Sequence, residues 1–108
     1  MSESDLERIE AISGGYRASQ ILLTASRLGV FEAIGTDGGT AEGLAARLDS
    51  SPRGIRILLD ALVALDLLEK AEGRYVNAPV AFRYLLPDAP DSQAAKLHHA
   101  ARLYEQWS

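Results

Sequence analysis

The chain contains 108 residues, which is enough for one compact domain with a modest core. Apolar residues make up 47% of it and charged residues 24%, which excludes a disordered tail, a collagen-like repeat and a charged linker. The 11 Lys and Arg residues against 15 Asp and Glu residues leave a net charge of −4. Because phosphate backbones attract basic surfaces, this balance argues against nucleic acid as a partner.

The composition also bounds the chemistry and the location of the protein. There is no cysteine, which excludes a disulfide framework, a thiolate zinc site and a thiol nucleophile. The uninterrupted apolar runs are far shorter than the roughly 20 residues that cross a bilayer. The first five residues are acidic and polar, unlike the opening of a signal peptide. We therefore expect a cytoplasmic protein with no membrane contact.

The first third of the chain predicts three helices. One begins at Ser4 and ends at the glycine pair 14–15, a second spans residues 16–28, and a short third spans 30–34. Apolar residues of the first two recur at helical spacing: Leu6, Ile9, Ile12, Tyr16, Ile21, Leu22 and Ala25. This is more apolar surface than so small a domain covers by itself. We therefore assign residues 16–35 to dimerisation, because a second copy is the commonest cover.

Residues 40–78 predict a helix-turn-helix followed by a β-hairpin wing. Thr40 is expected to cap a helix that ends at Leu48, and Ser51 to cap a longer helix of residues 52–65. The hairpin spans residues 67–77, with its turn at Glu72 and Gly73.

The remaining residues predict one short and one longer helix. The short helix spans residues 79–86, and a last one spans 92–107 within a terminal segment of residues 91–108. The predicted fold is thus mainly α: a winged helix-turn-helix core with a small β-hairpin wing and additional N- and C-terminal helices. Because the helical spacing continues to Trp107 with no stop signal, we expect the chain to be an N-terminal fragment of a longer protein.

The helix of residues 52–65 is apolar around more than half of its circumference. A surface helix needs only one apolar stripe, yet Ile57, Ala61 and Ala64 lie opposite the expected inner face. We expect this outer side to be covered by another helix or another chain. The candidate dimer interface therefore comprises Leu6, Ile9, Ile12, Tyr16, Ile21, Leu22, Ala25, Ile57, Ala61 and Ala64.

The alternative function is that of a DNA-binding winged-helix regulator. The same helix would then be the recognition helix and would offer basic side chains to the groove. Asp60 offsets part of the positive charge of the outward Arg53 and Arg56, and the predicted wing carries as many acidic as basic residues. This alternative is therefore the weaker one.

Residues for catalysis, cofactor binding or metal binding are not recognisable. No G-x-G or P-loop pattern occurs, and the glycine-rich segment 35–43 precedes an ordinary capped helix. His98 and His99 are adjacent, so on a helix they point about 100° apart. Phe31 and Phe82 are expected in the core. We predict no catalytic, cofactor-binding or metal-binding residue, and a self-contained small enzyme is the least supported class.

Several stretches match a known family in order and spacing, between Tyr16 and Trp107. They are residues 25–34, 40–48, 52–65, 67–69 and 73–75. In these the chain resembles the N-terminal dimerisation domain of S-adenosylmethionine-dependent O-methyltransferases of the plant caffeate and bacterial polyketide type. Asp66 stands where that family often has glycine, a position that aspartate tolerates better than most residues.

The resemblance implies an intertwined homodimer and a role in pairing the subunits of a methyltransferase. It places a Rossmann-like catalytic domain, with the S-adenosylmethionine site and the catalytic base, downstream of residue 108. The substrate it implies is a small-molecule acceptor whose hydroxyl receives the methyl group. The N-terminal helices of the family also help to form the wall of the acceptor pocket.

Overall fold

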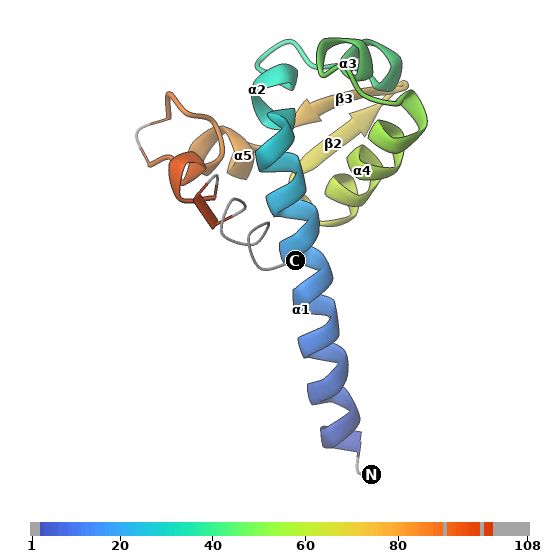
Figure 1. Cartoon of the computed structure of the whole chain (residues 1–108), viewed down its shortest axis with the longest axis vertical. Coiled ribbons are helices and arrows are strands. Elements are labelled where there is room, and N and C mark those ends of the chain that lie inside the picture. Colours follow the sequence, from blue (N-terminus) through green and yellow to red (C-terminus); the bar gives the residue numbers. More distant parts are fainter. Residues whose placement is uncertain (1–2, 90, 98, 101–108) are drawn as a thin grey trace.

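The computed structural model describes residues 3–89, 91–97 and 99–100. A long helix projects from a globular part that contains all the other elements (Figure 1). The elements of the described residues are α1 (Glu3–Leu28), α2 (Val30–Ile34), β1 (Gly39–Thr40), α3 (Ala41–Arg47), α4 (Pro52–Ala64), β2 (Leu68–Ala71), β3 (Arg74–Asn77) and α5 (Pro79–Tyr84).

Helix α1 is one continuous helix of 26 residues, so the predicted break at Gly14 and Gly15 is wrong. Each glycine costs a helix interior about 1 kcal/mol relative to alanine, which weakens a helix without stopping it. The flanking glutamate, arginine, alanine and leucine residues favour helix on both sides. The helix ends where Gly29 adopts a φ of 76°, which only glycine takes without strain.

Helices α3 and α4 begin at the two predicted caps. The Thr40 hydroxyl accepts a hydrogen bond from the backbone N–H of Gly43 at 3.1 Å. The Ser51 hydroxyl accepts from the N–H of Gly54, and Pro52 occupies the first helical position. The two helices pack against each other, and the hairpin follows α4. The observed order of helix, turn, longer helix and hairpin is therefore the predicted one.

The described residues form one antiparallel sheet with the strand order β1-β3-β2. The hairpin turns at Glu72 and Gly73, as predicted, and both residues have positive φ. Strand β1 was not predicted, because its two residues lie in a segment with loop composition. Gly38 comes so close to β3 that a Cβ there would lie 2.7 Å from the carbonyl oxygen of Tyr75.

A buried asparagine connects the sheet to α2. The Asn77 amide nitrogen donates to the carbonyl oxygens of Phe31 at 3.1 Å and Gly35 at 3.0 Å. Phe31 lies in α2 and its carbonyl also accepts from the Gly35 N–H, whereas Gly35 lies just after the helix. Asn77 therefore holds the C-terminal end of α2 against the end of β3.

The core forms where α1, α2, α3, α4 and the sheet meet. Its large fully buried side chains are Tyr75, Phe31, Ile34, Leu44, Leu59, Leu62, Leu68 and Val30. Phe82 was expected in the core but is 38% exposed, because α5 buries Ala81 instead. Ala25, a predicted interface residue, is fully buried in this core and so is not available to a partner.

The C-terminal part departs slightly from its predicted boundaries. Helix α5 ends at Tyr84, two residues before the predicted end. The last described helical residues are 94–97 and 99–100, so this helix begins at Ala94 instead of Ser92. The Ser92 hydroxyl accepts a hydrogen bond from the N–H of Ala94. His98 and the predicted helical residues 101–107 lie outside the described residues.

We predict that Asp66→Gly stabilises the chain by about 0.5 kcal/mol, because Asp66 has a φ of 62° immediately after α4. The matched control is Ala46→Gly on the exposed side of α3, which should destabilise by about 1 kcal/mol. Urea denaturation of both variants measures the two signs. If both glycines destabilised the chain, the strain assigned to Asp66 would be absent.

Candidate functional site

The N-terminal part of α1 extends beyond the globular part, and we call residues 3–17 the shaft (Figure 1). Four of its large apolar side chains are exposed: Leu6 by 46%, Ile9 by 54%, Ile12 by 71% and Tyr16 by 53%. We call these four residues the shaft stripe. They all belong to the predicted interface, and the globular part of the same chain leaves them open to solvent.

The orientation of the shaft stripe explains this exposure. At about 100° per residue, Ile9, Ile12 and Tyr16 lie within about 60° of one another. The same geometry places them about 140–180° from Ala25, which is on the side that faces the core. Ile21 and Leu22, further along α1, are half-buried against the core. Ile9, Ile12 and Tyr16 therefore point away from the domain, and no described part of the same chain covers them.

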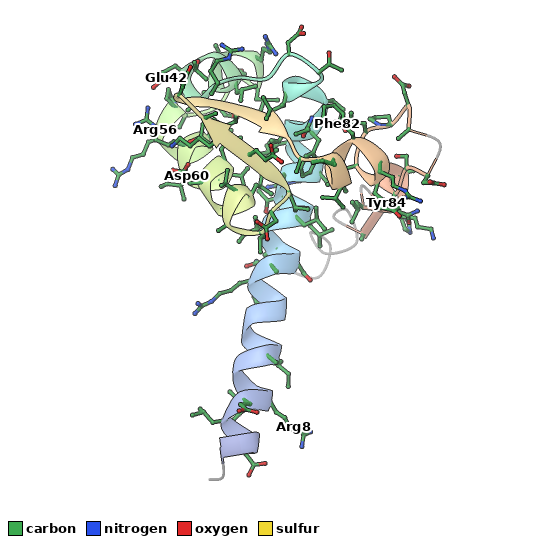
Figure 2. The ribbon with its side chains drawn as sticks, turned by 180° about the vertical axis from the view of Figure 1, so that it is seen from behind. Arg8, Glu42, Arg56, Asp60, Phe82 and Tyr84 are labelled. Carbon is green, nitrogen blue, oxygen red and sulfur yellow. The ribbon has the colours of Figure 1, made fainter. Side chains whose placement is uncertain are left out.

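A second exposed apolar surface lies on α4, and we call Ile57, Ala61 and Ala64 the outer face of α4. The side chain of Ile57 is 64% exposed, Ala64 is exposed and Ala61 is half-buried. The opposite side of the helix buries Ile55, Leu59 and Leu62 in the core. The described residues of the same chain place no helix over Ile57, and the cover by another chain stays a prediction. Because the shaft projects away, one chain does not bring its two exposed surfaces together (Figure 2).

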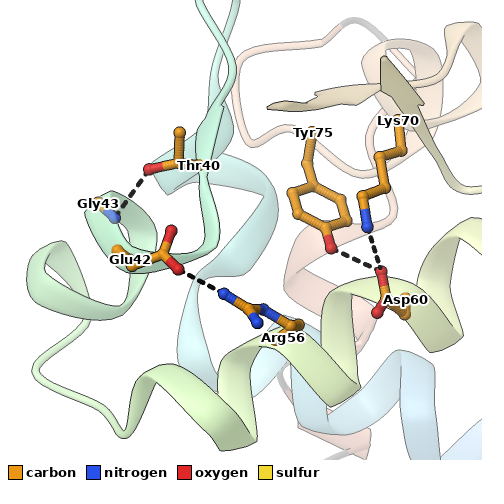
Figure 3. A network of polar contacts seen from close by, with 7 residues as sticks. All are labelled: Thr40, Glu42, Gly43, Arg56, Asp60, Lys70 and Tyr75. Carbon is orange, nitrogen blue, oxygen red and sulfur yellow. Dashed lines mark hydrogen bonds and ion pairs between the residues drawn. The ribbon is translucent and has the colours of Figure 1, made fainter. Parts of the chain in front are cut away.

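Between α4 and the hairpin lies a polar network that sequence reasoning missed (Figure 3). The Tyr75 hydroxyl donates to Asp60 Oδ1 at 2.5 Å, and Lys70 Nζ lies 3.4 Å from the same oxygen. Lys70 Nζ also lies 5.0 Å from the centre of the Tyr75 ring. Arg56 forms an ion pair with Glu42 of α3. The network joins α4 to its neighbours on both sides.

The network shifts the protonation equilibria of its members. The hydrogen bond from Tyr75 is the main cause that lowers the pKa of Asp60, and Lys70 lowers it further. Burial, and then Asp60, raises the pKa of the Tyr75 hydroxyl. Tyr75 and Asp60 raise the pKa of Lys70. These shifts favour a charged Asp60 carboxylate beside a neutral Tyr75 phenol, and the pair links α4 to the hairpin.

Two hollows of the described surface lie beside α2 and the segment after α5. They have volumes of about 450 and 510 Å³, and both are lined by Glu32 and Pro87. Phe82, Leu86 and Ala89 add apolar lining to the larger one. In the described part of the chain, no three His, Cys, Asp or Glu side chains gather as metal ligands. No described helix combines the length and apolarity that crossing a membrane requires.

Comparison with known proteins identifies the module. Residues 10–87 match the family model of the O-methyltransferase dimerisation domain. The chain is 35% identical over 105 residues to mouse acetylserotonin O-methyltransferase, covering 92% of this chain and 27% of that protein. It is 38% identical over 91 residues to a 3-hydroxy-5-methyl-1-naphthoate 3-O-methyltransferase of Streptomyces sahachiroi, covering 84% of this chain and 26% of that protein.

The fold shows the same relationship. The crystal structure of human N-acetylserotonin methyltransferase in complex with SAM superposes with a TM-score of 0.77 at 28% identity, covering 98% of this chain and 34% of that one. The chain thus spans about a quarter of the length of the curated relatives it matches. These comparisons give no support to the DNA-binding alternative.

We predict that Tyr75→Phe lowers the free energy of unfolding by about 1–2 kcal/mol at neutral pH, through loss of the hydrogen bond to Asp60. Because folding raises the pKa of Tyr75, its contribution is complete below about pH 10 and is lost as the pH rises further. Stability of the variant should therefore fall less steeply than that of the original chain between about pH 9 and 11.

Urea denaturation across this pH range measures both effects. Tyr84→Phe is the control, because Tyr84 lies on α5, away from the bond between Tyr75 and Asp60. Identical alkaline slopes for Tyr75→Phe and the original chain would contradict the role given to Tyr75.

Proposed function

We propose a function from one premise: the chain belongs to the family of O-methyltransferase dimerisation domains. Its role is to pair two subunits of an S-adenosylmethionine-dependent O-methyltransferase as a homodimer. The observation that carries this proposal is the shaft stripe, a row of large apolar side chains that the chain itself leaves exposed.

The energetics of the shaft support pairing. A helix that lacks tertiary contacts is marginal in water at this length, and the glycine pair 14–15 weakens the shaft further. Burial of an apolar side chain of this size contributes about 1.5–3 kcal/mol. A two-fold dimer uses the stripe twice, because the same surface is buried on both subunits. Pairing therefore stabilises both the shaft helix and the assembly.

We further propose that α3, α4 and the hairpin form a winged helix that serves as a scaffold and not as a DNA reader. Of the two arginines on the outward side of α4, Arg56 is engaged by Glu42. Asp60, between Ile57 and Ala64, adds a negative charge to the side that would face the phosphates. Such a helix is better suited to protein contacts than to a nucleic acid.

The activity of the whole protein is the transfer of a methyl group from S-adenosylmethionine to a hydroxyl of a small-molecule acceptor. This part of the proposal rests on the names of the relatives, of which this chain matches about a quarter. A separate catalytic domain would bind the cofactor and supply the reacting groups, and the present module would hold two such domains in fixed register. The cytoplasmic location expected from the sequence belongs to the same proposal.

We predict that the chain is a dimer at protein concentrations on the order of tens of micromolar, as expected for a modest interface. Ile12→Glu should weaken dimerisation by about a hundredfold or more. The substitution would bury an unpaired carboxylate at each copy of the stripe. It should leave the globular part folded, because Ile12 is 71% exposed and lies in the shaft, outside the core. Sedimentation velocity measures the mass, and circular dichroism checks the fold.

The control is Ala46→Glu, which places the same charge on the exposed side of α3 and should leave the dimer unchanged. A monomeric original chain would contradict the proposed pairing role. So would an Ile12→Glu variant that dimerises as tightly as the control.

A further inference from the structure

We propose that the shaft of one copy docks on the outer face of α4 of a second copy. This inference rests on the proposed function, since it takes self-association as given and names the surface that receives the shaft. It pairs two surfaces that are both exposed in the single chain and that one chain does not bring together (Figure 2).

The distribution of exposed apolar side chains favours this pairing. Seven large hydrophobic residues are exposed in the described part of the chain. Four form the shaft stripe, and a fifth is Ile57 on the outer face of α4. Packing of Ile9, Ile12 and Tyr16 on α4 would cover these three residues and Ile57 with one kind of contact. Packing of shaft against shaft would leave Ile57 in water.

The spacing of the two surfaces is complementary. Ile9, Ile12 and Tyr16 follow one another at intervals of three and four residues, whereas Ile57, Ala61 and Ala64 follow at four and three. Both sets span about 10.5 Å at 1.5 Å per residue. The two alanines leave room for the larger side chains of the stripe, so the helix axes can approach to about 8–10 Å.

Charge selects a parallel orientation of the two helices. Asp5 lies one turn before Ile9 on the same side of α1, and Arg53 lies one turn before Ile57 on α4. With Ile9 beside Ile57, the parallel arrangement brings Asp5 to Arg53 and to the positive end of the α4 dipole. The reverse arrangement would place Asp5 near the negative end of α4 and near Asp66. The two helices therefore run in the same direction across the interface.

Two-fold symmetry makes the contact reciprocal. If the shaft of the first copy lies on α4 of the second, the shaft of the second lies on α4 of the first. Each dimer then contains two identical contacts. One substitution on α4 consequently removes two contacts, as does one substitution on the shaft.

Cysteine cross-linking tests the pairing directly, because the chain has no cysteine of its own. Two single variants, Ile12→Cys and Ala61→Cys, are co-expressed, one carrying a mass tag, and are then oxidised mildly. We expect a disulfide between the tagged and untagged chains. Ala46→Cys on α3 replaces Ala61→Cys as the control and should give no mixed product. Efficient Ile12–Ile12 cross-linking without the mixed product would overturn the proposal in favour of shaft-to-shaft packing.

Charge reversal tests the orientation. Arg53→Glu and Asp5→Arg should each weaken dimerisation by about tenfold, and the double variant should recover most of the loss. Additive losses in the double variant would overturn the parallel register.

Ile57→Glu separates this inference from the proposed function. It should weaken dimerisation about as strongly as Ile12→Glu while the chain remains folded, because Ile57 is 64% exposed. A dimer that tolerates Ile57→Glu but not Ile12→Glu would refute docking on α4 and leave the pairing role intact. A monomeric original chain would refute both.

Discussion

The shaft stripe exposes large apolar side chains that a single chain does not cover. Helix α1 carries apolar residues on two opposite sides, and the globular part covers only the side that contains Ala25. The other side, with Ile9, Ile12 and Tyr16, projects into solvent in a single chain. A weak helix with a glycine pair gains little from its own sequence, so its order must come from packing. The proposed self-association would supply that packing with residues that the chain already has.

Helix α4 is the central element of the globular part and is used on three sides. Its inner side supplies Leu59 and Leu62 to the core. A second side carries Asp60 and Arg56, which connect α4 to the hairpin and to α3. Its outer face is apolar and exposed, and we assign it to a second copy. A helix anchored on two sides by its own chain presents its third side rigidly, which reduces the ordering cost of association.

Local signals predicted most of the fold, because capping and turn chemistry act over a few residues. The caps at Thr40 and Ser51 and the turn at Glu72 were found in this way. Contacts between residues that are far apart in the sequence could not be predicted from such local signals. Strand β1 exists only because β3 runs beside it, and the side of α1 that contains Ala25 is buried only because the core lies there. The same holds for the bond between Tyr75 and Asp60, which are 15 residues apart.

Amide hydrogen exchange along the shaft measures whether a second copy covers it. If a second copy covers the shaft, the amides of residues 5–17 exchange slowly at concentrations where the chain is paired and speed up on dilution. The amides of core residues such as Leu59 stay slow throughout and serve as the internal reference. Fast exchange in the shaft at every concentration, with the core still protected, would show that no partner covers it and would contradict the account.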